Sequence, residues 1–415
     1  MTLDLQINQT RLMTEIDDLS AFSDVPAPAV TRILYTETDM AARAYIKEKL
    51  DTAGFPWRED AMGNLFARWE GSSPELPAVA TGSHIDAIPY SGRYDGVVGV
   101  LGAIEALRAL KEAGFQPKRS LEVILFTSEE PTRFGVGCLG SRAMAGFIEA
   151  SHLLDLHDDE GLSFDQARNR AGYTGDLEGV RVVDAPYAYF IELHIEQGPR
   201  LEAAQIPIGI VTSIAASSTV RVTIEGDGGH AGTVMMTDRH DALLAASELA
   251  LAAEVVALES GSPDAVATVG IFQVHPGASN SIPSQIQLTV DLRDKDQTVR
   301  DAMLNRLQEF LAQIAERRGI TYHFDILNAD PSGHSDPTII AAAEKATNTL
   351  GLTALKMVSR AYHDTVFMGQ ICPIAMLFIP SENGYSHRPE EFSTAREIVQ
   401  GVQVLALTLA ELAQS

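Results

Sequence analysis

The N-terminal half of the chain alternates between continuous apolar runs and stretches with helical periodicity. Ala78–Gly82 and Leu121–Thr127 are largely apolar, which is typical of parallel strands buried on both faces. Val97–Ala113, between them, shows the helical period, so the three segments predict a βαβ unit. Thr36–Ala53 predicts another helix and Tyr187–Leu193 another strand. This pattern predicts a three-layer α/β domain.

The order of predicted helices and strands changes near residue 214, and the changed order continues to about residue 330. This segment is framed by small or turn-forming residues at 215–218 and 330–333. The order of its elements is βαββαβ, which is typical of a ferredoxin-like fold. The elements are expected at Thr219–Glu225, His240–Leu258, Ala265–Val274, Gln285–Leu292, Asp296–Arg318 and Tyr322–Leu327. We therefore expect one α/β domain built from residues 1–213 and 331–415, interrupted by a lid at 214–330.

Composition narrows the class of protein. The chain has 415 residues, 45% of them hydrophobic, which supports a large core and two domains. A formal net charge of −25 argues against nucleic acids and anionic membranes as partners. Two cysteines without a Cys-x-x-Cys motif, no signal peptide and no apolar run of membrane-spanning length lead us to expect a soluble cytoplasmic protein.

Acidic residues follow two of the predicted buried strands. The run Leu121–Thr127 is followed, after Ser128, by Glu129 and Glu130. The run Ala78–Gly82 is followed by Asp86 and, further on, by Asp95. An ionised carboxylate away from water costs several kcal/mol unless it is paired. The positive charge of a bound metal would remove that cost, so these strand ends predict a metal site.

Five residues at or just past strand ends, or in short polar loops, are the candidate ligands. Carboxyl ends of strands in open α/β sheets are where such sites assemble. Nitrogen and oxygen ligands without sulfur suit two divalent ions rather than one structural zinc, with Asp95 as the bridging carboxylate. The candidates are His84, Asp95, Glu130, His194 and His387.

Two further acids have expected supporting roles. Asp86 lies two residues after His84 and is expected to hold the ring N–H of that histidine with its carboxylate. Glu129 cannot easily bind the same ion as Glu130, so we expect it to act as the general base. Alone, a His-x-Asp sequence is usually a surface loop and a Glu-Glu pair a solvated helix face. Their joint placement at strand ends favours the metal site.

Several motifs resemble a known family. Gly82–Asp86 and Tyr94–Val100 are similar to the dinuclear metallohydrolases of the aminoacylase and carboxypeptidase type. His194–Pro199, with the sequence HIEQGP, resembles the amidohydrolase branch acting on N-carbamoyl and ureido compounds. The resemblance covers nearly the whole chain. It implies a zinc-exopeptidase type of α/β fold and a homodimer formed through the lid.

Other segments resemble the members of this branch that act on ureidoglycolate, namely Thr127–Gly146, Ser359–Met368 and Gly384–Phe392. Most members have Ser-Gly-Ala-Gly-His-Asp where this chain has Ser359 through Asp364 with Arg360 and Tyr362. A cation and a phenol beside the site favour a small, polar, acidic substrate over a bulky apolar one.

The resemblance also implies roles for individual residues. The five candidate ligands match the family's metal ligands, and Glu129 matches its general base. Gln197, Asn280 and Arg293 match substrate-contacting positions, and His230 matches a lid histidine that completes the site of the partner subunit. His363 is expected to orient substrate or another site residue.

The lid residues also have simpler interpretations. Arg293 offers a fork for a carboxylate, but Asp291 and Asp294 flank it and an ion pair within the lid is the alternative. Asn280 is a common turn former. His230 lies among glycines, where backbone can approach a ligand closely, and the alternative is an exposed turn histidine.

We therefore expect hydrolysis of a ureido C–N bond, with ureidoglycolate giving glyoxylate, ammonia and carbon dioxide. Manganese is the first choice of metal, with zinc, cobalt or nickel as alternatives. Allantoate and N-carbamoyl-L-amino acids are the alternative substrates. A dipeptidase fits Gln197 and the His194 loop less well. A non-catalytic ureide-binding dimer is the rival from another class, although such a sensor would not need Glu129.

Overall fold

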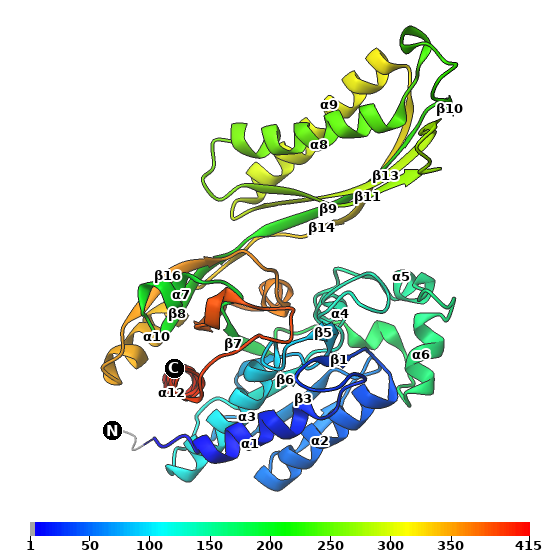
Figure 1. Cartoon of the computed structure of the whole chain (residues 1–415). Coiled ribbons are helices and arrows are strands. Elements are labelled where there is room, and N and C mark those ends of the chain that lie inside the picture. The colour runs from blue at the N-terminus through cyan, green and yellow to red at the C-terminus, as the bar shows by residue number, and fades with distance from the viewer. Residues whose placement is uncertain (1–4) are drawn as a thin grey trace. The chain divides into compact units, whose positions relative to one another are not determined.

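The computed structural model describes residues 5–415 (Figure 1). The chain forms two compact units. The larger contains the chain up to Thr212 together with residues 334–359 and 363–415, and the smaller contains residues 213–333 and 360–362. Among residues 5–415, no helix combines the length and the hydrophobicity that crossing a membrane requires.

The larger unit is built on a nine-stranded mixed sheet. Its strands lie in the order β15 (Gly333–His334), β8 (Ile208–Ile214), β17 (Ile374–Ile379), β7 (Tyr187–Ile195), β4 (Ala78–Ser83), β6 (Leu121–Leu125), β3 (Leu65–Trp69) and β2 (Trp57–Glu59), and β16 (Ala354–Ser359) pairs with β8. The four strands β17, β7, β4 and β6 are parallel, whereas β8 and β3 pair antiparallel on either side of them. The parallel centre therefore brings four carboxyl strand ends to one edge of the sheet.

Helices pack on both faces of this sheet. One face is covered by α1 (Gln9–Ser20), α2 (Glu37–Ala53), α3 (Val97–Glu112), α10 (Pro337–Thr349) and α12 (Ala395–Ala413). The other is covered by α4 (Leu139–Ala145), α5 (Ala150–Asp155), α6 (Phe164–Arg170) and α11 (Asp364–Met368). The shorter elements are α7 (Arg200–Ala204), the antiparallel pair β1 (Val30–Arg32) and β5 (Ala87–Ser91), and 3₁₀ turns at Leu177–Val180 and Glu382–Gly384.

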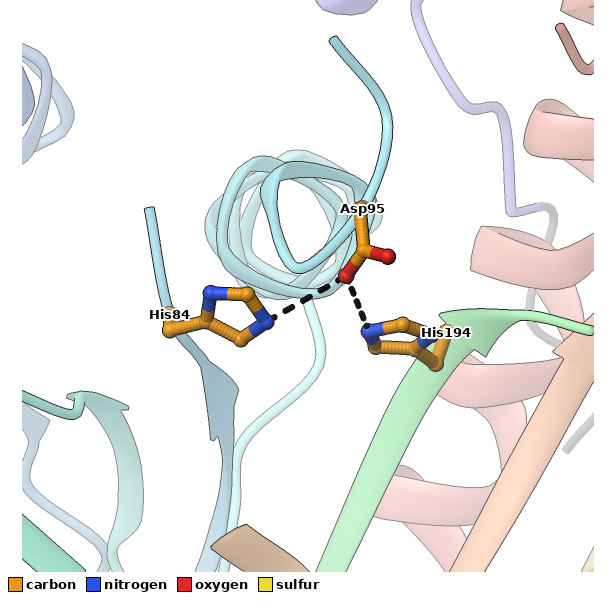
Figure 2. A group of neighbouring side chains, drawn as sticks. All are labelled: His84, Asp95 and His194. Atoms are coloured by element: carbon orange, nitrogen blue, oxygen red, sulfur yellow. Dashed lines mark ion pairs between the residues drawn. The ribbon is translucent and has the colours of Figure 1, made fainter. Parts of the chain in front are cut away.

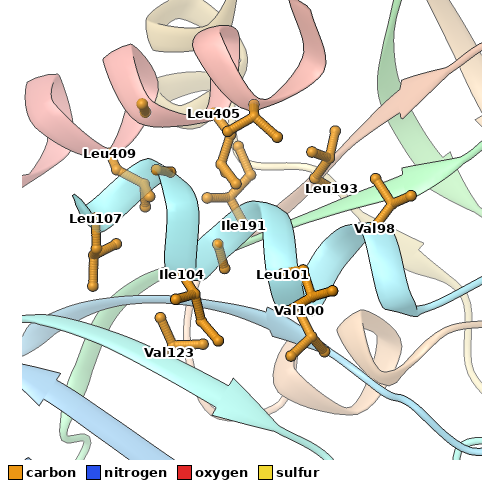
Figure 3. Packing of buried hydrophobic residues seen from close by; sticks show 14 of the residues in the cluster. Val98, Val100, Leu101, Ile104, Leu107, Val123, Ile191, Leu193, Leu405 and Leu409 are labelled. Carbon is orange, nitrogen blue, oxygen red and sulfur yellow. The ribbon is translucent and has the colours of Figure 1, made fainter. Parts of the chain in front are cut away.

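Alternate residues of each central strand enter different cores. Val79 and Val123 pack with α3 and α12 in one cluster, part of which Figure 3 shows, and Ala80 and Ile124 pack in the cluster on the opposite face. Both faces are therefore dry, which explains the continuous apolar runs in the sequence. Burial of these side chains, at about 25 cal/mol per Å² of apolar surface, makes the sheet a rigid base for residues at its edge.

Helix ends follow local signals in the sequence. The side chain of Thr36 accepts a hydrogen bond from the Asp39 N–H at the start of α2, and Gly54 ends the helix with a left-handed φ of 69°. At α12, Thr394 and Glu397 form a reciprocal capping box. These caps fix where the chain leaves and enters the layers around the sheet.

The smaller unit has a four-stranded antiparallel sheet with two helices. Along the chain it contains β9 (Ala216–Glu225), α8 (Ala242–Glu259), β11 (Val266–His275), β13 (Gln285–Asp294), α9 (Gln297–Arg318) and β14 (Thr321–Ala329). The strand order is β11-β13-β9-β14. A second, short pair is β10 (Gly229–His230) with β12 (Ser281–Ile282), and a 3₁₀ turn lies at Met236–Asp238. This is the ferredoxin-like arrangement, so the predicted fold class, an α/β domain with a βαββαβ insertion, is confirmed.

Two local expectations were wrong. Residues 216–218, expected as part of a small-residue connection, begin β9, because their backbone pairs with the end of β13 from Leu292 to Asp294. Residues 360–362 group with the smaller unit, because the Arg360 guanidinium pairs with Asp264 at 3.0 Å and the Arg360 carbonyl accepts a hydrogen bond from Arg293. The cation of Arg360 is thus already paired within that unit.

Candidate metal centre

The five predicted ligands all belong to the larger unit. His84 follows β4, Glu130 lies beyond the end of β6, and His194 lies near the end of β7. Asp95 immediately precedes the turn into α3, and His387 lies in the loop after β17. Because the four strands are parallel, their carboxyl ends meet at one edge, and the residues converge there.

The ligand atoms form two groups that share one carboxylate. His84, Asp95 and His194 make one group and Asp95, Glu130 and His387 the other, with the ligand atoms of each within 4.8 Å of one another. Asp95 Oδ1 lies 3.4 Å from His84 Nε2 and 3.1 Å from His194 Nε2 (Figure 2). His387 Nε2 lies 3.5 Å from Asp95 Oδ2 and 3.4 Å from Glu130 Oε1.

Two buried imidazoles have the tautomer that a metal requires. His84 Nδ1 lies 3.1 Å from the Asp86 main-chain carbonyl, and His194 Nδ1 lies 2.9 Å from the Ile195 main-chain carbonyl. A carbonyl only accepts, so each Nδ1 carries the proton and each Nε2 is left as an acceptor. His194 Nε2 accepts from the Gly96 N–H at 3.1 Å, and both Nε2 atoms lie beside Asp95. The buried Nε2 of His84 has no hydrogen-bond partner among residues 5–415. A nitrogen lone pair facing a carboxylate is repulsive unless a proton or a metal ion lies between them, so these residues fit a divalent metal.

Burial of the acids leads to the same conclusion. Burial, together with the nearby Asp95, raises the pKa of Glu130 to about 7, and burial raises the pKa of Glu129 well above its usual value. Although burial alone would lower the pKa of His84, Glu129 and the neighbouring aspartates raise it. Without a metal, protons must therefore neutralise the cluster, and divalent ions would replace those protons.

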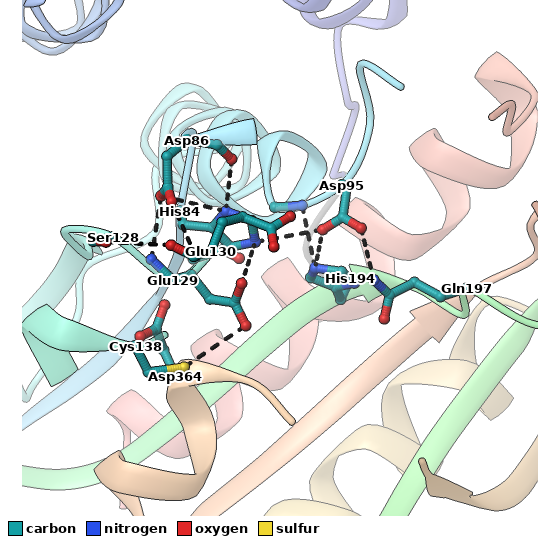
Figure 4. Close-up of polar contacts among 12 residues, drawn as sticks. His84, Asp86, Asp95, Ser128, Glu129, Glu130, Cys138, His194, Gln197 and Asp364 are labelled. Carbon is teal, nitrogen blue, oxygen red and sulfur yellow. Dashed lines mark hydrogen bonds and ion pairs between the residues drawn. The ribbon is translucent and has the colours of Figure 1, made fainter. Parts of the chain in front are cut away.

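Asp86 supports the site differently from the expected way. Its carboxylate accepts hydrogen bonds from the backbone N–H groups of Glu129, at 3.3 Å, and Glu130, at 2.9 Å (Figure 4). The ring of His84 is held by the main-chain carbonyl of Asp86, while the carboxylate Oδ1 lies 3.6 Å from Nδ1. Asp86 therefore fixes the loop that carries the paired glutamates as well as the first histidine.

Four non-glycine residues around the site have left-handed backbone. They are Ser128 with φ 57°, Cys138 with φ 54°, Gln197 with φ 55° and His387 with φ 57°. Such conformations cost of order 1–3 kcal/mol each and persist only where surrounding contacts hold them. Two of the four, Gln197 and His387, are predicted site residues, so surrounding contacts must hold their backbone in place.

Comparison with known proteins assigns the family, because residues 80–411 match the model of peptidase family M20/M25/M40. The chain belongs to this family. It is 53% identical to ureidoglycolate hydrolase of Arabidopsis thaliana, with 98% of this chain and 87% of that protein covered. It is also 53% identical to ureidoglycolate hydrolase of Oryza sativa subsp. japonica, with 98% and 85% covered. Allantoate amidohydrolase of Bacillus subtilis is 35% identical, with 92% and 93% covered.

Solved structures give the same relationship. The crystal structure of AtUAH in complex with glyoxylate matches with a TM-score of 0.90 and 53% identity, covering 99% of this chain and 98% of that chain. The crystal structure of AtUAH in complex with (S)-hydroxyglycine matches with a TM-score of 0.91 and 52% identity, with the same coverage. The chain is thus a hydrolase of the M20 family that is similar to enzymes of ureido compounds along its whole length.

Other predicted residues of this M20 protein lie close to the ligands. Gln197 Nε2 donates to Asp95 Oδ2 at 2.6 Å, so this side chain contacts the shared carboxylate. The buried ring of His363 packs against that of His194, with centroids 4.6 Å apart, and its Nε2 lies 3.2 Å from the Ser359 hydroxyl. This contact with a ligand histidine agrees with an orienting role better than with direct exposure to substrate.

Sequence reasoning missed several buried groups here. Glu192 lies within β7 and accepts hydrogen bonds from the hydroxyls of Ser83 and Thr365. Asp364 accepts a hydrogen bond from the Ser141 hydroxyl. Burial and the nearby Glu192 raise the pKa of Asp364 to about 8. The thiol of Cys138 lies 3.7 Å from Glu129 Oε1. A glutamate inside an apolar strand is a signal that could have identified Glu192. The other contacts depend on tertiary folding.

The remaining predicted residues belong to the smaller unit. Asn280 and His230 are brought together, because β10 pairs with β12 and the Asn280 carbonyl accepts from the Ala231 N–H at 2.9 Å. Arg293 lies near the far end of β13, where it pairs with Asp291 at 2.7 Å and donates to the Arg360 carbonyl at 2.9 Å. The ion pair considered as the alternative for Arg293 is therefore present.

Metal affinity of the folded protein is expected to rise between about pH 6 and about pH 9. Glu130, with a pKa of about 7, and His387, whose pKa Asp95 raises to about 9, must both lose protons before they can bind an ion. Titration calorimetry with Mn²⁺ in buffers of different ionisation enthalpy measures this proton release. Glu130→Gln should release fewer protons than the parent. An affinity that does not change with pH would contradict the prediction.

Proposed function

We propose that this protein is a metal-dependent amidohydrolase that cleaves the ureido C–N bond of ureidoglycolate. The observation that carries the proposal is the pair of ligand groups sharing Asp95, with Glu129 beside them. The substrate is supported by relatives at 53% identity that are named ureidoglycolate hydrolase. Glyoxylate and (S)-hydroxyglycine, bound in the AtUAH structures, are what the proposed reaction would yield.

The proposed reaction consumes one water. Water adds to the ureido carbonyl, the bond from that carbon to the substituted nitrogen breaks, and the nitrogen takes a proton. This gives hydroxyglycine and carbamate, and carbamate decomposes to ammonia and carbon dioxide. Hydroxyglycine then loses its amine as a second ammonia and becomes glyoxylate.

Glu129 has the position of a general base. Its Oε2 lies 3.8 Å from His84 Nε2, yet it belongs to neither ligand group. Oε1 faces the Cys138 thiol, so one oxygen is oriented by the protein and the other faces the ligands. A raised pKa in the ion-free protein suits a group that accepts a proton from water and passes it to the leaving nitrogen.

Two divalent ions would sit in the two ligand groups, with Asp95 between them. Bound there, they would polarise the ureido carbonyl and lower the pKa of water. We propose manganese, because three carboxylate oxygens and three imidazoles, with no sulfur ligand, suit a fairly hard ion, and zinc, cobalt and nickel remain the alternatives.

We also propose a homodimer formed through the smaller unit. Its strand β11 lies at the edge of the four-stranded sheet, so no strand within residues 5–415 pairs with its outer backbone groups. Beside it, α8 exposes a stripe with helical spacing, in which Leu251 is 65% and Leu258 78% exposed, with Leu244 and Val255 on the same stripe. An open edge next to exposed leucines is a liability that a second copy of the chain would cover.

The layout of the smaller unit supports sites shared between two chains. His230 and Asn280 lie beyond the Gln285 end of β13, whereas Arg293 is near its other end. At about 3.3 Å per residue these ends are roughly 25 Å apart, too far for one small ureide to touch both. We propose that His230 and Asn280 complete the site of the partner subunit, where His230 would stabilise the oxyanion. Arg293 would hold the substrate carboxylate in the site of its own chain.

Arg293 keeps donors for this task. Three of its N–H groups are used by Asp291 and the Arg360 carbonyl, and a guanidinium has five. The contacts to Asp291 and Arg360 would hold the remaining pair in a fixed direction. Gln197 and His363 would act through the ligands Asp95 and His194, which they contact.

Substrate identity is tested with a panel. Ammonia release from ureidoglycolate, allantoate and N-carbamoyl-L-amino acids is measured with and without added Mn²⁺, and ureidoglycolate should give the highest kcat/KM by about 100-fold or more. Preference for allantoate or an N-carbamoyl amino acid would identify one of the alternative functions. Tight binding of a ureide with no ammonia release would favour the sensor.

Glu129→Gln should bind both ions as the parent does and lose about 10²- to 10⁴-fold in kcat. The amide keeps the size of the side chain but cannot accept the proton. Metal content by mass spectrometry and steady-state rates measure the two effects separately, and Glu70→Gln, an exposed glutamate of the same unit, is the matched control. Near-normal turnover in Glu129→Gln would refute the assignment of the base.

The shared site is tested by mixing two inactive variants. In a heterodimer of His230→Ala and Glu129→Ala, one site has lost both groups and the other has both. Unfolding and refolding an equal mixture should therefore restore about a quarter of parental activity, since half the dimers are mixed. Verified heterodimers with no activity above the homodimers would show that His230 does not serve the partner subunit.

A further inference from the structure

Glu391 is a buried acid outside both ligand groups, and it joins two distant loops. Only 4% of the residue is exposed. Its Oε1 accepts hydrogen bonds from the backbone N–H groups of Tyr94, at 2.8 Å, and Asp95, at 3.1 Å. Its Oε2 lies 3.0 Å from the hydroxyl of Ser386, the residue before His387. One carboxylate therefore connects the loop of the shared ligand with the loop of the last ligand.

Ser386 extends this connection to the shared carboxylate itself. Its hydroxyl lies 2.8 Å from Asp95 Oδ2, the oxygen that also accepts from Gln197 Nε2. Asp95 Oδ2 is the oxygen that faces His387. Glu391 thus acts on both the backbone and the side chain of Asp95, through two amides and one hydroxyl.

The space around Glu391 is fitted to it. A Cβ atom on Gly92 would lie 2.3 Å from both the Cβ and the Oε1 of Glu391, far inside van der Waals contact. Gly92 therefore leaves the volume that Glu391 fills. This fit is independent of the hydrogen bonds and indicates that the loop 92–96 and Glu391 form one packed arrangement.

The loop of His387 needs such support. His387 has a left-handed φ of 57°, which a non-glycine residue adopts only where neighbouring contacts hold it. The N–H of Glu391 donates to the Arg388 carbonyl at 3.1 Å and closes the following turn. His84 and His194, in contrast, adjoin or belong to the central strands β4 and β7.

We infer that Glu391 is a positioning residue that aligns Asp95 with His387, so that Asp95, Glu130 and His387 can hold the second ion. This inference rests on the two-ion site of the proposed function. Glu391 binds no metal and contacts no substrate in this role. The first group, anchored on β4 and β7, should hold its ion without Glu391.

The test is metal content of the full-length protein. Parent and variants are stripped of metal, reloaded with Mn²⁺, desalted and analysed by plasma mass spectrometry, with circular dichroism to confirm folding. The parent should retain two ions per chain. Glu391→Ala should retain one, with affinity for the other lowered by about 10- to 100-fold, as for other lost supports of metal ligands.

Three further variants separate positioning from folding. Glu391→Gln should retain two ions, because its Oε1 can accept from both amides while its Nε2 donates to the Ser386 hydroxyl. Gly92→Ala should lose the same ion as Glu391→Ala, because the added methyl group displaces Glu391. Glu390→Ala is the matched control, since this exposed neighbour pairs with Arg388 at the surface, and it should retain two ions.

Folded Glu391→Ala that keeps both ions with parental affinity would overturn the inference. If Glu391→Ala does not fold, Gly92→Ala decides, and two firmly bound ions in that variant would likewise overturn it. A parent protein that binds fewer than two ions would instead contradict the two-ion site itself. The two failures are therefore distinguishable without any measurement of activity.

Discussion

The structure depends on one electrostatic constraint, the convergence of buried acceptor groups on Asp95. The Nε2 atoms of His84 and His194 face one oxygen of this carboxylate, and His387, beside Glu130, faces the other. In a dry interior such an arrangement is repulsive unless cations occupy it. The rigid parallel sheet, the left-handed residues and the contacts behind the ligands are the means by which the fold maintains this arrangement.

Much of this site could be predicted because acids at the ends of buried strands have no other explanation. The candidate ligands and Glu129 were predicted from their positions near strand ends or in short polar loops, together with the resemblance. The contacts behind them were not, because sequence spacing does not show which atom of a residue is used. Asp86 holds His84 by its carbonyl rather than its carboxylate, and Glu391 lies in a charged surface-like sequence although it is buried.

The smaller unit keeps two sets of proposed substrate-contacting residues apart. Arg293 is fixed by Asp291 and the Arg360 carbonyl, and His230 and Asn280 are carried on a short strand pair at the opposite end of the sheet. The length of β13 keeps these groups apart in one chain. If each contributes to catalysis, the active site is a property of the dimer, and a monomer would have the metal centre without a complete substrate site.

Charge balance explains why both ions should matter to the base. Asp86, Asp95, Glu129 and Glu130 are the four carboxyl groups at the two proposed ligand groups, where the histidines would serve as neutral ligands. Two divalent ions supply four positive charges and balance four carboxylates. One ion would leave two negative charges uncompensated, and we expect a proton at Glu129, which binds no metal and whose pKa burial already raises. Loss of the second ion would thus disable the base as well as the ligand geometry, which is why a residue as distant from the reaction as Glu391 can matter to catalysis.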